Sequence, residues 1–202
     1  MVKEAVDSGD LGDVITVWSR RMGRGIPAGY NWRTDPDLMC GMSVESLSHD
    51  IDLIRWIAGD VVDVRATVNA SNPELPGFDD NAHVVMRLAN GGSAFIHASW
   101  SSHLGSNSRG VIGTNGAAEV VGPGLWDSQE YRWRTADMDA EGSQQIDDAF
   151  SADSYVRENE HFLDCVLNDR EPSITGRDGL AALRVSHAIL RSHGEDVVAR
   201  VG

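Results

Sequence analysis

Residues 82–100 read AHVVMRLANGGSAFIHASW, and this stretch decides the class of fold. From 84 to 88 every second residue is apolar, which is the period of a half-buried β-strand. Asn90-Gly91 comes next, a pair that favours a tight hairpin in which both residues take φ > 0. A return strand is expected to end at Trp100. Such a hairpin predicts antiparallel pairing, with one face of the sheet covered and the other free.

Similar strand signals lie on both sides of the hairpin. The expected strands cover residues 14–19, 62–68, 84–88, 94–100, 111–112, 118–121, 131–134 and 197–201. Helical spacing predicts helices over 42–58, 153–167 and 175–192, and residues 3–7 are expected to be the end of a further helix. We therefore predict an α+β fold, an open and mostly antiparallel β-sheet with helices packed on one face, as a single domain over residues 1–202 with no Rossmann domain.

The ends and faces of the three longer helices can also be predicted. Ser43 is the expected N-cap of the first and Gly59 its stop, and its apolar stripe is Val44, Leu47, Ile51, Ile54 and Ala58. The second is expected to turn Tyr155, Phe162, Leu163 and Val166 inward. The third begins with a capping box of Thr175 and Asp178 and is expected to bury Leu180, Leu183, Ala188 and Ile189 and to stop at Gly194.

Composition excludes several classes of protein. Hydrophobic residues make up 41% of the 202, enough for a core, and the longest apolar runs are far too short to cross a bilayer. The net charge of −14 disfavours nucleic acid and anionic membranes as partners. Cys40 and Cys165 lie far apart, which favours reduced thiols and, together with a charged N-terminus that does not resemble a signal peptide, a cytoplasmic protein.

The best candidate for chemistry lies on the helix expected over 42–58. Spacings of four and three place Glu45, His49 and Asp52 on one stripe of that helix. An imidazole beside carboxylates can act as a general acid or base on a substrate hydroxyl or carbonyl. The Gly- and Pro-rich loop expected over 22–40 adds Trp32 and Arg33, whose guanidinium can bind substrate oxygens. The same residues are also typical of a solvated helix edge and an ordinary surface arginine.

Two other kinds of site find no support in the sequence. Residues 23–28 formally match the G-x-G-x-x-A form of the dinucleotide fingerprint, but Pro27 and the loop that follows leave no helix to receive a pyrophosphate. The histidines form no metal-ligand cluster, so neither a cofactor-binding residue nor a metal ligand is predicted in this chain.

The order of these features resembles the C-terminal domain of the glucose–fructose oxidoreductase / inositol dehydrogenase / MocA (Gfo/Idh/MocA) family of NAD(P)-dependent oxidoreductases. The resemblance covers nearly the whole chain and is most specific at the block from Glu45 to Gly59. It is also carried by residues 8–14, 32–36, 80–81, 90–91, 99–100, 112–116 and 178–189.

The resemblance implies a substrate-binding domain of a dehydrogenase that acts on a sugar, polyol or similar hydroxylated small molecule. His49 would be the acid/base and Glu45 a second catalytic residue, although Asp is the commoner residue at that position. Arg33, Trp32 and Asp52 would bind substrate. NAD or NADP would be bound by an N-terminal Rossmann domain, in cis or in trans, and the sheet would mediate a homodimer or a higher homo-oligomer.

That nucleotide domain and its catalytic lysine have no counterpart here, since Lys3 is the only lysine and does not match that position. We therefore expect the isolated chain to bind no cofactor and to be inactive alone. Two hypotheses remain open. Either the chain is part of a dehydrogenase, or it is a non-catalytic dimerisation or small-ligand-binding module that has lost its nucleotide-binding domain.

Overall fold

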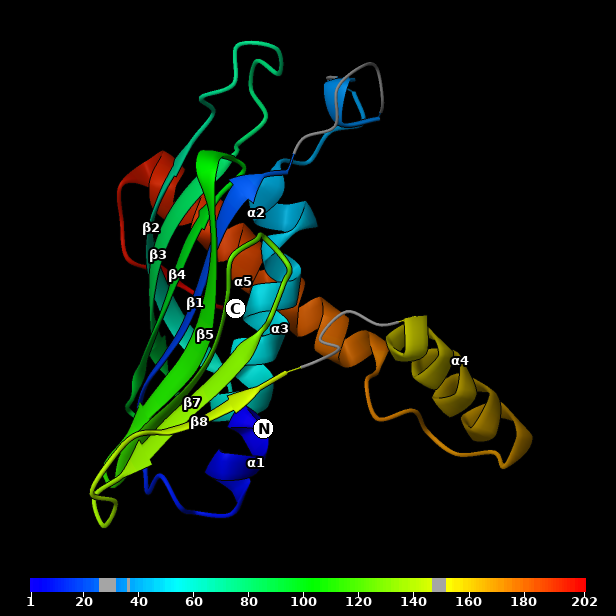
Figure 1. Cartoon of the computed structure of the whole chain (residues 1–202). Helices are drawn as coiled ribbons and strands as arrows, with labels where there is room; N and C mark the ends of the chain where they lie inside the picture. Colours follow the sequence, from blue (N-terminus) through cyan, green and yellow to red (C-terminus); the bar gives the residue numbers. More distant parts are fainter. Residues whose placement is uncertain (26–31, 36, 147–151) are drawn as a thin grey trace.

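A nine-stranded sheet with helices along one face organises the molecule (Figure 1). The computed structural model describes residues 1–25, 32–35, 37–146 and 152–202. The strands are β1 (Val14–Arg24), β2 (Val61–Asn69), β3 (Asn81–Leu88), β4 (Ser93–Ser99), β5 (Ser101–Gly113), β6 (Gly116–Gly122), β7 (Glu130–Thr135), β8 (Gly142–Gln145) and β9 (Ala199–Arg200). The helices are α1 (Val2–Asp7), the short 3-10 helix η1 (Trp32–Thr34), α2 (Met42–Glu45), α3 (Leu47–Ala58), α4 (Ala152–Leu167) and α5 (Gly176–Glu195).

The sheet is open and mostly antiparallel, as predicted, with the strand order β8-β7-β6-β5-β1-β4-β3-β2-β9. The one parallel pairing in the described part of the sheet joins β1 and β4, where Trp18 lies opposite Phe95. β1 also pairs antiparallel with β5, so this early strand separates two strands that follow each other in sequence. Only Trp100 lies between β4 and β5, and the chain moves from one side of β1 to the other there.

The β3–β4 hairpin forms, but its turn is not the one predicted. Gly91 has φ +87°, whereas Asn90 is not among the described residues with positive φ. The N–H of Gly91 donates to the Leu88 carbonyl at 3.1 Å and the N–H of Leu88 donates to the Gly92 carbonyl at 2.9 Å. This is a longer loop with one left-handed glycine, in which the Asn90 side chain accepts from the N–H of Gly92.

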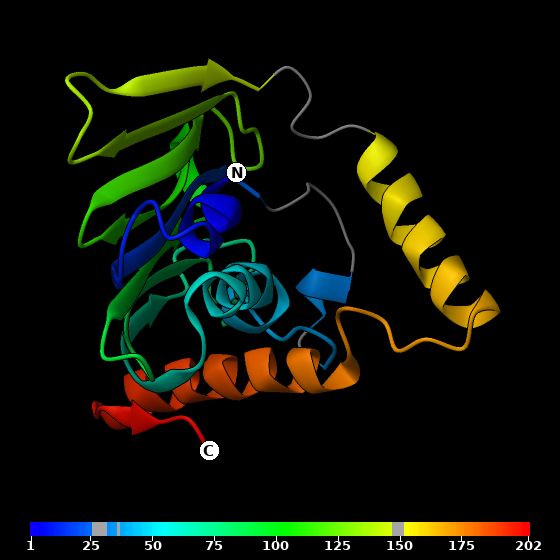
Figure 2. The same cartoon turned by 90° about the horizontal axis from the view of Figure 1, so that it is seen from below.

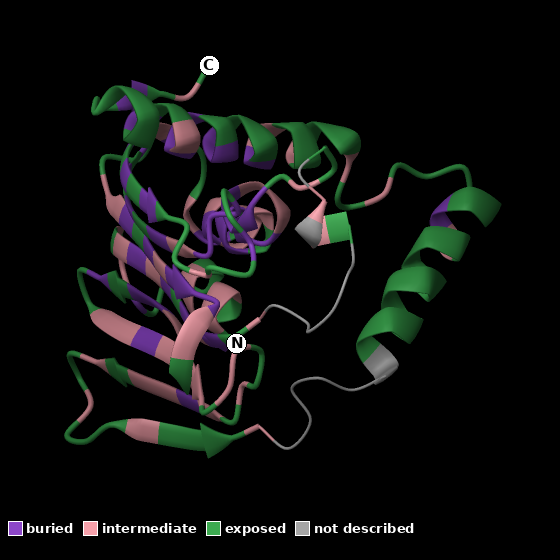
Figure 3. Ribbon diagram, turned by 90° about the horizontal axis from the view of Figure 1, so that it is seen from above, coloured by how far each residue is buried: buried purple, intermediate pink, exposed green. Residues whose placement is uncertain are grey.

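The core lies between the inner face of the sheet and the helices α3 and α5 (Figures 2 and 3). Leu47, Ile51 and Ile54 of α3 are fully buried, as the apolar stripe predicted. α5 contributes a second row of small and branched side chains: Ala182, Val185, Ala188 and Ile189. The opposite face of the sheet is open, with Val85 and Phe95 exposed.

The helix expected over 42–58 is interrupted at Ser46, which separates α2 from α3. Ser43 is not its N-cap, since the cap position is Gly41 at φ +76°. Instead, the carboxylate of Asp79, which lies outside the helix, accepts a hydrogen bond from the N–H of Ser43 at 2.8 Å. Gly59 ends α3 as predicted, with φ +89°.

The prediction that α4 turns apolar side chains inward is wrong. Tyr155, Phe162, Leu163 and Val166 are each 57–62% exposed. α4 stands away from the sheet and from α5, with its surface open to solvent (Figures 2 and 3). No other described segment covers this apolar row.

Other expectations change at their boundaries. α5 begins at the predicted capping box but passes Gly194 and ends at Glu195, with Asp196 at φ +55° as its C-cap. Leu180 and Leu183 near its start are exposed. β1 extends to Arg24, into the stretch expected to be loop from residue 22. β8 lies at residues 142–145, where the sequence predicted no strand. Pro27 and Ala28, on which the rejected fingerprint also depends, lie outside the described residues.

Candidate functional site

The break between α2 and α3 positions the candidate site. Asp79 holds the start of α2 by accepting hydrogen bonds from the N–H and the hydroxyl of Ser43, at 2.8 and 2.5 Å. Burial raises the pKa of the Asp79 carboxyl, and these hydrogen bonds from Ser43 act in the opposite direction. At the other end of the break, the Ser46 carbonyl accepts the N–H of His49 at 3.3 Å. Glu45 and His49 therefore stand on two short, separately anchored helices.

Glu45 is paired with Arg33, the arginine that the loop supplies. The guanidinium Nε of Arg33 lies 2.8 and 2.9 Å from the two carboxylate oxygens of Glu45, and its Nη2 also donates to Glu45. The hydrogen bond to Glu45 is the main cause that raises the pKa of Arg33. The same guanidinium lies 4.6 Å from the ring of Trp32 and 5.8 Å from that of Trp100. Glu45 is thus oriented by Arg33, and no hydrogen bond joins it to His49 in the described chain.

His49 borders three concave surfaces of the domain. One, of about 390 Å³, is also lined by Arg33 and Glu45, with Arg24 and Trp126 on its walls. The imidazole meets the Trp126 ring edge to face, with 6.2 Å between the centroids and an interplanar angle of 85°. Three of the predicted residues therefore come together around one cavity.

Asp52 does not join that group. It lines a different cavity of about 370 Å³, on another side of His49, together with Arg55, Trp56 and Asp178. The expectation of one continuous stripe fails here, because Ser46 interrupts the helix between Glu45 and His49. Trp32 is 41% exposed at the outer side of Arg33.

Asp50, next to His49 in sequence, is a fully buried carboxylate that was not among the predicted site residues. Its Oδ2 accepts from Arg21 through Nε at 3.0 Å and Nη2 at 2.5 Å, and its Oδ1 accepts the hydroxyl of Ser19 at 2.6 Å. Arg109 approaches Oδ1 at 3.8 Å. The sequence feature that could have predicted this buried site is the spacing of Ser19 and Arg21 on one strand, because it places two polar side chains on the inner face of β1.

Arg21 also contacts two neighbours of His49, Ser46 and Trp126. Its Nη2 donates to the Ser46 carbonyl at 3.1 Å, the same oxygen that accepts the N–H of His49. Its guanidinium carbon lies 4.0 Å from the centre of the Trp126 ring, which meets the imidazole. Arg21 and Asp50 thus form a buried ion pair beside His49, which is itself exposed.

This arrangement suits proton transfer to or from a hydroxyl in a partly enclosed site, with an Arg–Glu pair at hand for substrate oxygens. Within the described residues, no three His, Cys, Asp or Glu side chains are grouped to hold a metal ion. No helix in the described segments is long and apolar enough to cross a membrane. The described strands form no parallel βαβ unit for a dinucleotide, so these residues do not fit a cofactor-binding domain.

Fold and site together define a class: a sheet domain that presents a histidine and an Arg–Glu pair but contains no nucleotide-binding unit among its described elements. The family model for the GFO/IDH/MocA C-terminal domain matches residues 1–119, more than half of the chain. The chain therefore belongs to the GFO/IDH/MocA C-terminal domain family, as its sequence predicted.

Curated relatives cover nearly all of this chain. Inositol 2-dehydrogenase of Rhizobium meliloti (strain 1021) is 28% identical over 204 aligned positions, and the alignment covers 96% of this chain and 58% of the relative. D-apiose dehydrogenase of Rhizobium rhizogenes (strain K84 / ATCC BAA-868) is 24% identical over 95% of this chain and 57% of its own length. The chain thus spans less than two thirds of these relatives.

Solved structures show the same fold. The aldose-aldose oxidoreductase from Caulobacter crescentus, complexed with glycerol, gives a TM-score of 0.84 at 23% identity, over 98% of this chain and 59% of that one. Levoglucosan dehydrogenase in complex with NADH and L-sorbose gives a TM-score of 0.86 at 15% identity, over 100% of this chain and 62% of that one. At these identities the likeness concerns the fold alone.

Proposed function

We propose that this chain is the substrate-binding, proton-transferring part of an NAD(P)-dependent dehydrogenase that acts on a sugar, a polyol or a similar hydroxylated small molecule. The observation that carries the proposal is the position of His49, which borders a cavity with the Arg33–Glu45 pair and is framed by Trp126. Inositol 2-dehydrogenase and D-apiose dehydrogenase, by their names, act on hydroxylated substrates of this kind.

In this proposal His49 takes the proton of a substrate hydroxyl as that carbon is oxidised, and returns it in the reverse direction. Glu45 is the second catalytic group and keeps Arg33 in place. Arg33 and Asp52 bind substrate oxygens from two sides of His49, and Trp32 stacks against the sugar or polyol ring. NAD or NADP, bound by a domain outside these residues, would supply the hydride acceptor.

A nucleotide-binding domain, in cis or in trans, is the partner we propose for α4. The exposed apolar row of α4 is the surface that would contact this domain, because contiguous apolar patches on soluble proteins commonly mark a contact surface. The open reading frame around this chain tests the point. An adjoining βαβ unit with a glycine fingerprint supports a dehydrogenase, whereas a frame without one supports the non-catalytic module.

We also propose that the open face of the sheet pairs two copies into a homodimer or a higher homo-oligomer. Trp18 stacks on Phe95 there, with 6.3 Å between the ring centroids, and Val85 and Ile112 extend the apolar surface. Phe95→Lys should then shift the sedimentation coefficient towards the monomer, while Leu104→Lys, at an exposed position near the start of β5, should not. A wild-type chain that sediments as a monomer at high concentration contradicts this proposal.

Substitution of His49 tests the proposed chemistry. In the dehydrogenase that contains this domain, His49→Ala should lower kcat by about 10²- to 10⁴-fold, the range of general acid–base catalysis. His187→Ala, at an exposed histidine of α5, is the matched control and should leave turnover unchanged. Near-normal turnover of the His49→Ala enzyme would rule out the acid/base role.

A further inference from the structure

One of the cavities beside His49, the one that Arg109 lines, has more cations than carboxylates on its walls, unlike the molecule around it. The chain carries a net charge of −14. Around His49, however, Arg33 is balanced by Glu45, whereas Arg21 and Arg109 share Asp50. Two guanidinium groups against one carboxylate leave one positive charge uncompensated.

The surplus charge resides on Arg109. Asp50 interacts more closely with other groups: Oδ2 accepts two hydrogen bonds from Arg21 at 2.5 and 3.0 Å, and Oδ1 accepts one from Ser19 at 2.6 Å. Arg109 Nε reaches Oδ1 only at 3.8 Å, beyond a normal hydrogen bond. Burial is the main cause that lowers the pKa of Arg109, yet a guanidinium stays protonated in proteins. A cation in this position gains stability from an anion that can reach it.

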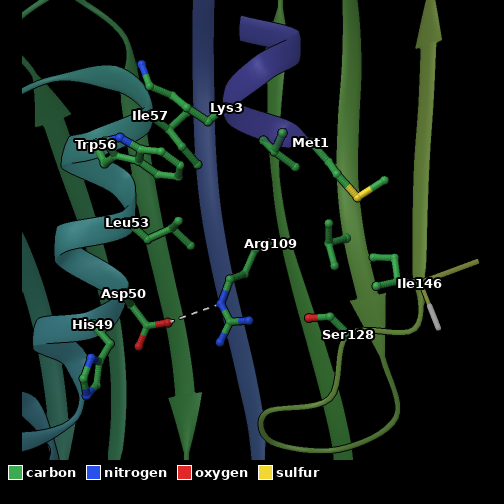
Figure 4. Close-up of a pocket in the computed structure, with 12 residues that line it drawn as sticks. Met1, Lys3, His49, Asp50, Leu53, Trp56, Ile57, Arg109, Ser128 and Ile146 are labelled. Atoms are coloured by element: carbon green, nitrogen blue, oxygen red, sulfur yellow. Dashed lines mark ion pairs between the residues drawn. The ribbon is translucent and has the colours of Figure 1, made fainter. Parts of the chain in front are cut away.

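Arg109 faces a cavity of about 440 Å³ between α1, α3 and the strands β5 and β6 (Figure 4). Its walls are largely apolar, with Leu53 on one side and Val120 on the other. His49 lies on the same wall as Asp50, and the hydroxyl of Ser128 lies across from them. Lys3 and Met1 also line the cavity, but the Lys3 ammonium is paired with Asp7 at 2.7 Å and the Met1 ammonium with Glu4 at 2.6 Å. Within the described lining, Arg109 is therefore the cation left to bind a ligand.

We propose that this cavity binds the carboxylate of a polyhydroxy acid, with Arg109 as the anion partner and Ser128 as a further donor. This inference rests on the proposed function and deepens it: the substrate is an acidic sugar derivative rather than a neutral sugar. A planar carboxylate matches the guanidinium fork, and its hydroxylated carbon chain can extend towards His49. A single guanidinium on β5, only distantly paired with Asp50, suits a single carboxylate better than a pyrophosphate, which typically needs the N-terminus of a helix.

The 202-residue chain itself provides the test, by calorimetric titration with D-glucuronate and with D-glucose, which differ in the carboxylate. Wild type should bind glucuronate at least about tenfold more tightly than glucose, since hydrogen bonds between charged groups are the stronger ones. Added salt should reduce the difference. Arg109→Gln should abolish it, and Arg20→Gln, at an exposed position of β1 that alternates away from Arg21, should preserve it.

Arg109→Gln leaves the Arg21–Asp50 pair intact, so the variant should fold. Arg109→Lys, which keeps the charge but not the fork, should give an intermediate preference and serves if the glutamine variant is unstable. Three outcomes would overturn the inference. They are equal binding of the two sugars, no binding of glucuronate, and binding of NADH that is tighter than that of glucuronate and depends on Arg109 in the same way. Because none of these titrations measures turnover, failure here is distinguishable from failure of the His49 role.

Discussion

α4 and α5 have the same amphipathic pattern and opposite surroundings. In α5, Val185 and Ile189 are buried against the sheet at 1% and 0% exposure. In α4, Phe162 and Leu163 of the apolar row are 60% and 57% exposed. The comparison teaches that amphipathicity defines an apolar face but does not say which surface will cover it. The packed part of the molecule and α4 should therefore respond differently to the same kind of change.

The largest expected difference concerns two ion pairs. Asp50 and Arg21 are each 1% exposed, whereas Asp164 of α4 and its partner Arg170 are 47% and 58% exposed. Loss of one partner of a buried pair costs about 3–5 kcal/mol, while an exposed pair contributes about 0–1 kcal/mol. Asp50→Ala should lower the free energy of unfolding in urea by the larger amount and Asp164→Ala by the smaller. Similar losses for both variants would contradict the contrast.

Truncation of apolar side chains should reveal a difference in unfolding free energy between the two helices that is nearly as large. Ile189→Ala should cost about 2–5 kcal/mol of unfolding free energy, because it leaves a cavity in the core. Leu163→Ala should change it by no more than about 0.5 kcal/mol in the 202-residue chain, since the side chain is already exposed. Urea unfolding followed by far-UV circular dichroism measures both. A large loss from Leu163→Ala would mean that α4 is covered in solution, for example by a second copy.

The start of α5 should contribute less than its core. The Thr175 hydroxyl accepts the N–H of Arg177 at 3.2 Å, and the N–H of Thr175 donates to Asp178 at 2.8 Å. Thr175→Ala should cost about 1 kcal/mol, a typical loss for an N-cap. Thr175→Ser keeps the hydroxyl and should stay close to wild type in the same urea unfolding assay. Equal losses for alanine and serine would exclude the cap as the cause.

The smallest expected effect is a dependence on pH at the same cap. Hydrogen bonds from the N–H and the hydroxyl of Thr175 lower the pKa of the exposed Asp178 carboxyl. A lowered folded-state pKa stabilises the fold above the unfolded value of about 3.9 and loses that effect as the pH falls through the folded value. The thermal midpoint of wild type should therefore exceed that of Asp178→Asn slightly at pH 7, and the two should converge in acid. A difference that grows in acid would reverse the sign.

Much of the fold could be predicted because it depends on local periodicity. Alternation over residues 84–88 placed Val84 and Met86 in the core, and the Thr175–Asp178 box defined the start of α5. The turn at Asn90 was predicted in place but not in type, since the length of the loop depends on the register of the two paired strands.

The candidate site was predictable only in part. Glu45, His49 and Arg33 do line one cavity, as the sequence suggested, and their proposed roles await the substitutions above. Asp50 was missed and Asp52 was placed beside Glu45, because helical spacing cannot register the break at Ser46 or the arginine that β1 brings beneath α3.

The sequence by itself determined most of the elements, the apolar face of each, and the absence of a dinucleotide fingerprint in a suitable context. These follow from spacings of a few residues. Only the tertiary structure decided that β1 lies between β4 and β5, that Arg21 and Arg109 share one buried carboxylate, and that α4 stays uncovered. Such outcomes depend on contacts between residues far apart in the chain, whose free energies no local pattern contains.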